Sequence, residues 1–229
     1  SELVSIKRNA FYCSSLTSIF IPPSLEELQD RWCALTWDLI HVSISPKNNF
    51  FTLIENKKII VGKSNQMKPN YDVLVFACRD INQATIPSSI KRISQCAFMC
   101  CIHLDTIKFS EESELEIIEA DSFSHSTLMR INIPPKVQTI AESWCKFTWN
   151  LNSVSISPEN HFFKYMDNSS QKVIVKKSEE NDNVYDELIF ACRDIESTLI
   201  PSEIRHIASF SYQSCKNLTD VEFEENSEL

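Results

Sequence analysis

The amino-acid sequence predicts a β-rich solenoid, an elongated stack of short repeats in which each repeat packs only on its neighbours. Three observations lead to this fold class. Long stretches of the 229 residues occur twice, a shorter apolar pattern recurs within each copy, and the segments between apolar positions are too short for long helices. Because one such repeat cannot bury its own apolar ridge, the repeats are expected to stack into one array.

The longer repeat divides the chain into two halves. The stretch Leu16–Leu25 returns as Leu128–Val137, and Phe-Ala-Cys-Arg-Asp-Ile occurs at 76–81 and again at 190–195. We therefore expect super-repeats at about 1–112 and 113–229. The tripeptide Ser-Glu-Leu stands at 1–3 and at 227–229, which are equivalent points of the period. This predicts a single solenoid over residues 1–229, cut from a longer array.

The shorter repeat centres on the pattern Leu-x-x-Ile/Val-x-Ile/Phe. It occurs at 16–21, 39–44, 104–109, 128–133, 151–156 and 218–223. Uninterrupted units have the length of leucine-rich repeats, roughly 20–29 residues. Period-two alternation places the last two apolar side chains of the pattern on one strand face. We therefore expect a parallel strand ladder on the concave face, with turns, 3₁₀ pieces and short strands on the convex face.

Prolines and insertions interrupt the units at equivalent places. Proline has a fixed φ and no N–H, so it ends a strand, and it follows the expected strands at Pro22, Pro87, Pro134 and Pro201. The second unit of each copy is longer. Residues 49–61 alternate apolar runs around a polar centre, which predicts a β-hairpin, and a further strand is expected at 71–76. The second copy repeats this at 161–175 and 185–190, so we expect hairpin insertions within one solenoid.

The sequence of the repeat resembles that of a known family. The run Ile86-Pro87-Ser-Ser-Ile90-Lys-Arg-Ile93, followed by Ala97-Phe98, Cys101 and Leu104, resembles the BspA-like leucine-rich repeat. The Phe-Ala-Cys-Arg-Asp-Ile motif and the run Phe109–Leu115 look like the BspA-like surface antigens of trichomonad protists. The resemblance covers essentially the whole chain. It implies a leucine-rich-repeat solenoid that is not an enzyme and that serves adhesion or recognition of host and matrix proteins, often at the cell surface.

The chain departs from that family at one turn position. The family usually has glycine after the second Ile of each unit. This chain has other residues there: Gln29, Ser94, Glu119, Ala141 and Ala208. The turn must therefore take a conformation that a Cβ atom tolerates.

Composition argues against several classes of partner. The net charge is −9 with a pI near 5.1, and no Lys/Arg cluster is present, so we expect no nucleic acid. No apolar run approaches the roughly 18 residues of a transmembrane helix, so we expect no membrane insertion within this segment. The first residues also lack the apolar stretch of a signal peptide. The resemblance favours the cell surface, and a cytoplasmic location is the alternative.

The nine cysteines recur in part between the copies, as the pairs Cys33/Cys145, Cys78/Cys192 and Cys101/Cys215. Recurrence at equivalent positions predicts thiols that act as small apolar residues in a stacked core.

Two motifs have the spacing of reactive sites. Cys96, Cys100, Cys101 and His103 have the residue types of a zinc cluster, but only the third recurs in the second copy, so we expect no metal and no cofactor. The spacing of Ser88 and Lys91 is that of some acyl-enzymes, yet it also fits a strand-exit turn, and we assign no catalytic residue.

Two other recurrent pairs have structural interpretations. Arg79-Asp80 and Arg193-Asp194 occupy equivalent places, and we expect a local ion pair or turn that orients the following strand. The tryptophans recur as Trp32/Trp37 and Trp144/Trp149. We interpret these as convex packing rather than a ligand platform.

A candidate binding face follows from strand alternation. The residues expected to face away from the core are Ser18, Phe20, Ser43, Thr85, Thr106, Lys108, Arg130, Asn132, Ser155 and Glu222. Repeat proteins bind partners through such extended concave faces. We therefore expect a recognition or adhesion module for a host or matrix protein, or for a glycan. The alternatives are an intracellular protein-interaction scaffold and, third, an enzyme, for which the sequence shows no nucleophile and base pair.

Overall fold

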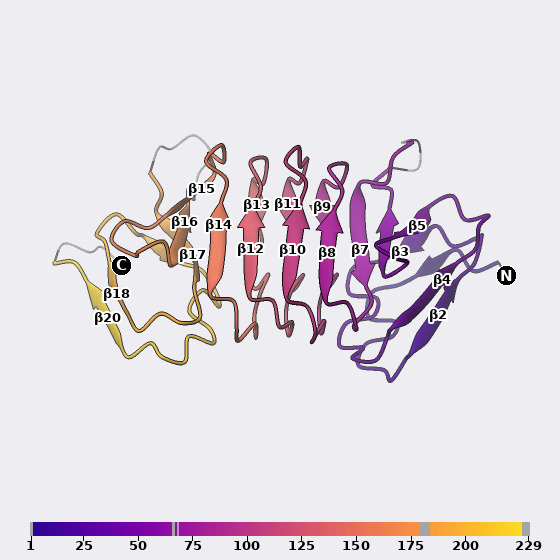
Figure 1. Ribbon diagram of the computed structural model, residues 1–229, viewed down its shortest axis with the longest axis horizontal. Helices are drawn as coiled ribbons and strands as arrows, with labels where there is room; N and C mark the ends of the chain where they lie inside the picture. The colour runs from indigo at the N-terminus through magenta and orange to yellow at the C-terminus, as the bar shows by residue number, and fades with distance from the viewer. Residues whose placement is uncertain (1, 66, 68, 179–183, 226–229) are drawn as a thin grey trace.

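The computed structural model describes residues 2–65, 67, 69–178 and 184–225 of the chain. It is an elongated β-solenoid whose first and last strands lie at opposite ends of the stack (Figure 1). The described residues form twenty strands and no helix. The predicted β-rich solenoid is confirmed. Its extent over 1–229 and its division at 112/113 stay predictions, and residues 1 and 226–229 lie outside the described part.

The first layer of the solenoid is a ladder of parallel four-residue strands. These are β2 (Ser18–Ile21), β4 (His41–Ile44), β8 (Gln83–Ile86), β10 (Thr106–Phe109), β12 (Arg130–Ile133), β14 (Ser153–Ile156), β18 (Ser197–Ile200) and β20 (Asp220–Phe223). The central sheet has the order β14-β12-β10-β8, while β2-β4 and β18-β20 form separate pairs at the ends (Figure 1). The ladder is therefore broken twice. We call the β4/β8 break the first seam and the β14/β18 break the second seam.

The second layer lies behind the first and consists of two-residue strands. These are β1 (Ser5–Ile6), β3 (Glu27–Leu28), β9 (Arg92–Ile93), β11 (Ile117–Ile118), β13 (Thr139–Ile140) and β19 (His206–Ile207). Parallel pairing links β1 to β3, β9 to β11 and β11 to β13. Each unit of the solenoid thus contributes one short strand to this layer and one longer strand to the ladder.

The predicted hairpin insertions are present, and they cause the seams. They form β5 (Phe51–Ile54), β6 (Ile59–Gly62), β7 (Val73–Ala77), β15 (Phe163–Tyr165), β16 (Val173–Lys176) and β17 (Glu187–Ala191). Strands β5, β6 and β7 pair antiparallel, and β7 then pairs parallel with β9. The second copy repeats this with β17 and β19. Because β6 pairs with the other edge of β7, β3 has no partner on its side facing β7 and pairs only with β1 among the described strands.

The core consists of the apolar positions that strand alternation predicts. In β8, β12 and β18 exposed and buried residues alternate strictly, and Ile86, Ile133 and Ile200 point inward. One cluster of buried side chains runs from Ile59 in the first insertion to Cys192 in the second. Each fully buried Ile or Leu contributes roughly 1.5–3 kcal/mol, so shared apolar contacts hold neighbouring units together.

The edge that connects the two layers is built from turns with left-handed residues. No 3₁₀ helix occurs in the described residues, so the expected 3₁₀ pieces are replaced by these turns. Each of six turns has two positive-φ residues four positions apart, and none is glycine: Asn9 and Cys13, Arg31 and Leu35, Cys96 and Cys100, Asp121 and His125, Ser143 and Phe147, Phe210 and Ser214. The positions that follow the second Ile are not among them, which meets the expectation that a Cβ is tolerated there.

The left-handed conformation makes glycine favourable where this chain has side chains. A left-handed non-glycine residue costs roughly 1–2 kcal/mol. Ser143 has φ of 63° in the turn before β14, so Ser143→Gly is expected to raise the free energy of unfolding by about 1 kcal/mol in urea denaturation. Ser153→Gly in β14 is the matched control, and it is expected to lower stability by roughly 0.5–1 kcal/mol. Equal destabilisation by both variants would contradict this account of the turns.

Candidate protein-binding face

We call the outward side of all eight first-layer strands the ladder face. Within the central sheet its side chains form a continuous surface. Register places Lys108 beside Thr85 and Asn132 beside Ser155. Register also places Thr106 beside Arg130, at the first outward position of each strand. Cross-strand neighbours on one face lie about 4.5–5.5 Å apart, so side chains of adjacent strands can contact one ligand together.

The structure places all ten predicted residues on strands of the ladder face. Thr106 is half-buried, and the others are exposed: Ser18, Phe20, Ser43, Thr85, Lys108, Arg130, Asn132, Ser155 and Glu222. The central sheet brings six of the ten together, whereas Ser18, Phe20 and Ser43 lie beyond the first seam and Glu222 beyond the second. That these residues bind a partner stays a prediction.

Sequence reasoning missed six exposed residues at outward positions of the same strands. They are His41, Gln83, Ser153, Ser197, Leu199 and Asp220. All of them occupy the first or third position of a four-residue strand. The alternation that selected Thr106 and Lys108 also selects these residues, so the signal was present in the sequence.

Charge is segregated along the ladder face. The outward residues of the central sheet include the cations Lys108 and Arg130 and no carboxylate. The described residues place no acidic side chain within ion-pair distance of either cation, although ten other basic side chains are paired. Strand β20 instead presents Asp220 and Glu222. At the other end β2 presents Phe20, with 60% of its surface exposed.

Each seam adds a hollow to the ladder face. Beside the first seam, Phe20, His41 and the hairpin tip at Lys57 line a hollow of ≈ 340 Å³. Beside the second seam, Lys172, Glu196 and Leu199 line one of ≈ 530 Å³. The ladder face is therefore a shallow surface with depressions and not a deep enclosed pocket.

The two recurrent Arg-Asp pairs form the expected turn and not the expected local ion pair. The N–H of Ile81 donates to the carbonyl of Cys78 at 3.0 Å, and that of Ile195 donates to the carbonyl of Cys192 at 3.2 Å. Asp80 is exposed and pairs with Lys58 at 2.6 Å, and Asp194 pairs with Lys172 at 2.7 Å. Arg79 and Arg193 are instead buried, with 1% and 3% of their surface exposed. In each turn the aspartate reaches solvent while the arginine enters the core.

The guanidinium of Arg79 bridges the first seam inside the core. Its Nε donates to the carbonyl of Thr36 at 3.1 Å, on the N-terminal side of the seam. Its Nη1 donates to the carbonyl of Ala97 at 3.2 Å, on the C-terminal side. Arg193 spans the second seam in the same way, with Nη1 3.0 Å from the carbonyl of Ser211 and Nη2 3.3 Å from the Cys145 thiol. Both arginines therefore have a structural position and are not on the ladder face.

Neutral groups surround the buried cation of Arg79. The guanidinium carbon lies 4.4 Å from the centre of the Phe76 ring, and Nη2 is 3.6 Å from the sulfur of Cys33. Burial raises the pKa of the Cys33 thiol to about 11, although Arg79 acts to lower it. The thiol is thus protonated at neutral pH. The charge is stabilised by carbonyl dipoles and an aromatic face rather than by a thiolate.

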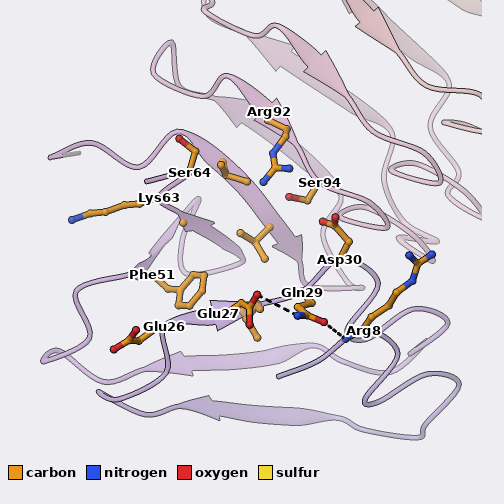
Figure 2. Close-up of a pocket in the computed structure, with 14 residues that line it drawn as sticks. Arg8, Glu26, Glu27, Gln29, Asp30, Phe51, Lys63, Ser64, Arg92 and Ser94 are labelled. Carbon is orange, nitrogen blue, oxygen red and sulfur yellow. Dashed lines mark hydrogen bonds between the residues drawn. The ribbon is translucent and has the colours of Figure 1, made fainter. Parts of the chain in front are cut away.

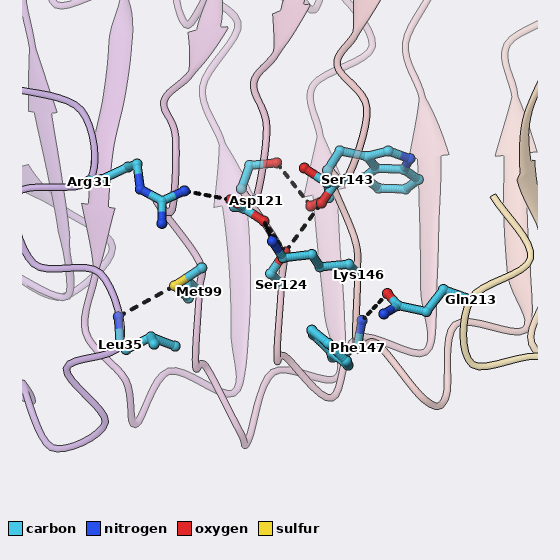
Figure 3. Close-up of polar contacts among 11 residues, drawn as sticks. Arg31, Leu35, Met99, Asp121, Ser124, Ser143, Lys146, Phe147 and Gln213 are labelled. Atoms are coloured by element: carbon cyan, nitrogen blue, oxygen red, sulfur yellow. Dashed lines mark hydrogen bonds and ion pairs between the residues drawn. The ribbon is translucent and has the colours of Figure 1, made fainter. Parts of the chain in front are cut away.

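The turn edge carries further contacts across both seams. Figure 3 shows Asp121 between Arg31 and Lys146, at 2.7 and 2.9 Å, with Arg31 reaching over the first seam. At the second seam the backbone N–H of Phe147 donates to Oε1 of Gln213 at 3.1 Å (Figure 3). The turn edge thus reinforces the junctions that the buried arginines span.

The tryptophans divide into two classes. Trp32 and Trp144 are buried and pack against Phe76 and Phe190, respectively, as the packing interpretation predicts. The second tryptophan of each copy, Trp37 or Trp149, is about half exposed on the turn edge. The Nζ of Lys216 lies 4.4 Å from the centre of the Trp149 ring.

The cysteines behave as small apolar residues. All nine are free thiols, and seven are buried. The zinc-like group is split, because its three cysteines are buried whereas His103 is exposed. No group of three His, Cys, Asp or Glu residues in the described part is arranged to hold a metal ion. None of the described segments forms a helix able to cross a bilayer.

Comparison with known proteins decides the family. The family model of the BspA type leucine-rich repeat region matches in six copies over residues 1–56, 75–166 and 159–229. The chain belongs to this family. It is thus a repeat module of the protein-interaction type, and the family and its fold are typically non-enzymatic. A search of curated proteins found no significant match.

Solved structures of a vaccine antigen and of leucine-rich repeat proteins share the fold. The pneumococcal vaccine antigen PcpA is 20% identical, with a TM-score of 0.61 over 98% of this chain and 51% of PcpA. A leucine-rich repeat protein from Eubacterium ventriosum is 17% identical, with a TM-score of 0.64 over 96% of this chain and 52% of that one. A leucine-rich cell surface protein from Faecalibacterium prausnitzii is 17% identical, with a TM-score of 0.56 over 96% and 64%. The chain spans about half the length of the first two, and the likeness shows the fold alone.

Thiol reactivity tests the burial of the cysteines. Burial raises the pKa of Cys96 and Cys100 to about 12 and of Cys78 and Cys101 to about 11, so these thiols stay protonated and shielded at pH 8. Cys13 is the exposed thiol. We expect one thiol to react rapidly with Ellman's reagent in the native protein and all nine to react after unfolding without reductant.

The control variant is Cys13→Ser, which should remove the rapid phase and leave eight thiols after unfolding. Fewer than nine thiols in the unfolded wild-type chain would reveal disulfides and contradict the free-thiol core.

Proposed function

We propose that the chain is a non-enzymatic recognition module that binds a protein partner through the ladder face and serves adhesion at the cell surface. The observation that supports this most directly is the strict alternation in the central sheet, which buries every second side chain and presents the others as one surface. Solenoids use such extended sheets to bind partners.

The charge of the ladder face indicates how it would engage a partner. Lys108 and Arg130 are cations on a protein of net charge −9, and hydroxyl and amide side chains surround them. A partner that places a carboxylate over this region gains charge-assisted hydrogen bonds from the two cations. Phe20 at one end offers an apolar contact, and aromatic side chains are common anchors in protein interfaces. A glycan would use the same polar groups.

Two observations support the proposed location at the cell surface: the family resemblance and the descriptions of two proteins with the same fold. PcpA is described as a vaccine antigen and the Faecalibacterium protein as a cell surface protein. An intracellular interaction scaffold is the second candidate, and the nine free cysteines favour it, because thiols persist in a reducing compartment. Disulfides in protein purified without reductant would favour export over the scaffold.

Two substitutions on the ladder face test the binding proposal. Phe20→Ala with Arg130→Ala removes an exposed aromatic ring and a cation without disturbing the core. We expect this double variant to weaken cell adhesion or partner capture by at least about tenfold, since each such contact contributes on the order of 1–2 kcal/mol. Adhesion and pull-down assays provide the measurement.

The matched control is Tyr12→Ala with Lys47→Ala, two exposed residues outside the first-layer strands. It should bind as the wild type does. Unchanged adhesion and capture by the Phe20 and Arg130 variant would contradict binding through the ladder face.

A further inference from the structure

A polar cleft opens in the second layer, where the first insertion separates β3 from β9. Figure 2 shows β3, with Glu27 and Gln29, on one side of it and Arg92 on the other. The cleft has a volume of ≈ 470 Å³, and Phe51 and Gly62 of the inserted hairpin contribute to its lining. It belongs to the second layer and is separate from the ladder face.

The cleft exists because one strand is missing from the second-layer stack. Within the central units each short strand bonds to the next, as β9 does to β11 and β11 to β13. The carbonyl of Lys91 accepts the N–H of Glu116 at 2.8 Å, and that of Ile93 accepts the N–H of Glu119 at 3.1 Å. At the first seam, however, the N–H of Lys91 donates to Asp72 of the insertion at 2.8 Å. Strand β3 therefore pairs with β1 alone among the described strands.

The free edge of β3 faces the cleft. The N–H groups of Glu27 and Gln29 donate to the carbonyls of Val4 and Ile6 in β1. Alternate residues of a parallel strand bond to opposite neighbours, so the N–H and C=O of Leu28 point away from β1. The Leu28 side chain is also half-buried, whereas Ile93 and Ile118 at the same position of the stack are fully buried. An unpaired backbone and an apolar side chain are thus available together.

The charges beside β3 indicate what kind of strand fits. Ion pairs connect neighbouring units of this layer. Lys7 pairs with Glu27 at 2.9 Å, and Lys91 pairs with Glu116 at 2.7 Å. The carboxylates of Glu26, Glu27 and Asp30 line the β3 side of the cleft together with one cation, Arg8. On the opposite side Arg92 is 3.5 Å from Glu119. Figure 2 shows the Lys63 side chain pointing away from the cleft, and its Nζ lies 5.2 Å from the Tyr71 ring.

The second copy has a charged side chain at the position equivalent to Gly62. The counterpart of Gly62 is Lys176, whose Nζ lies 3.1 Å from the carboxylate of Glu187. Gly62 is the one glycine of the chain, and a Cβ there would lie 3.0 Å from the Phe51 ring. A side chain at Gly62 would therefore have to displace the Phe51 ring, which lines the cleft.

We propose that this cleft binds an extended basic peptide that adds to β3 as a parallel strand. Its backbone pairs with the N–H and C=O of Leu28, an apolar side chain covers Leu28, and basic side chains approach Glu27 and Asp30. Strand addition to an open edge is a general mode of peptide recognition, with affinity from the main chain and selectivity from alternate side chains. This site is independent of the ladder face, and its failure would leave the proposed function untouched.

The first experiment measures binding of a peptide taken from the stack itself. The labelled peptide has the sequence Ser-Ile-Lys-Arg-Ile-Ser-Gln of residues 89–95. It contains β9, the short strand that would follow β3 if the insertion were absent. We expect saturable binding in fluorescence anisotropy. Hydrogen exchange of the Leu28 amide should slow by at least about tenfold when the peptide is bound, because a new backbone hydrogen bond protects it.

N-methylation of the peptide separates strand pairing from simple charge attraction. Methyl groups on the backbone nitrogens that face β3 should abolish binding, whereas methyl groups on the alternate nitrogens should leave it nearly unchanged. A peptide with both basic residues replaced by Glu should bind at least about tenfold more weakly. Any one of four results would overturn the proposal. These are a lack of saturable binding, equal binding of both methylated peptides, tighter binding of the acidic peptide, and unchanged hydrogen exchange of the Leu28 amide.

Variants of the protein locate the site. Gly62→Lys copies the residue of the second copy and should reduce peptide affinity at least about tenfold. Lys176→Gly is the matched control and should leave affinity unchanged. Glu27→Gln with Asp30→Asn keeps the shape of the cleft and removes two charges, so it remains informative if the lysine variant fails to fold. Wild-type affinity in a folded Gly62→Lys variant, or in the Gln/Asn variant, would place the peptide elsewhere and overturn the proposal.

Discussion

The structure depends on the two buried arginines that join the solenoid across its seams. A solenoid unit is stable only on its neighbours, and each insertion removes the direct contact between two ladder strands. Arg79 and Arg193 replace it with hydrogen bonds to carbonyls on both sides. Moving an ionised group into the core costs several kcal/mol, which hydrogen bonds to its donors offset. Nε of Arg79 has such a bond, whereas Nε of Arg193 is buried without a partner. The guanidinium fork, with five N–H donors in a fixed plane, suits this task better than any other side chain.

The seams also produce the surfaces at which binding is proposed. Because β7 and β17 join the second layer, the ladder face is divided into a central sheet and two end pairs, with hollows at the junctions. The same displacement leaves β3 with an open edge and creates the cleft behind it. An insertion in a repeat protein thus has two effects. It interrupts a regular surface, and it exposes backbone groups that a regular stack would have paired.

Sequence periodicity predicts the parts of the fold that recur in every unit. The ladder strands, the hairpins and the inward isoleucines follow from alternation and from spacing. The resemblance to the BspA-like repeat agrees with the matched family. The outward residues also follow from alternation, and His41 and Gln83, which were not predicted, occupy the first position of their strands.

The features that periodicity does not predict come from tertiary contacts. Arg79 stands next to Asp80 in sequence, and local reasoning pairs them, but only the three-dimensional stack shows that one enters the core and the other reaches solvent. The left-handed turns at residues such as Leu35 and Phe147 contradict local preference, and hydrogen bonds between stacked turns hold them. The cleft depends on Gly62, whose role appears only beside Phe51.

The most direct test of this account is amide hydrogen exchange, with urea denaturation, on Arg79→Met. Loss of the guanidinium leaves the carbonyl of Thr36 without its buried donor, which costs about 1–3 kcal/mol, and removes one of two donors to the carbonyl of Ala97, which keeps the N–H of Ala77. The account predicts a loss of at least about 2 kcal/mol and faster exchange of the units before the first seam, while the β10–β14 region keeps its protection. Asp80→Ala, at an exposed ion pair, should change stability by less than about 1 kcal/mol. An Arg79→Met variant as stable as the wild type, with unchanged exchange on both sides of the seam, would contradict the central role of the buried arginines.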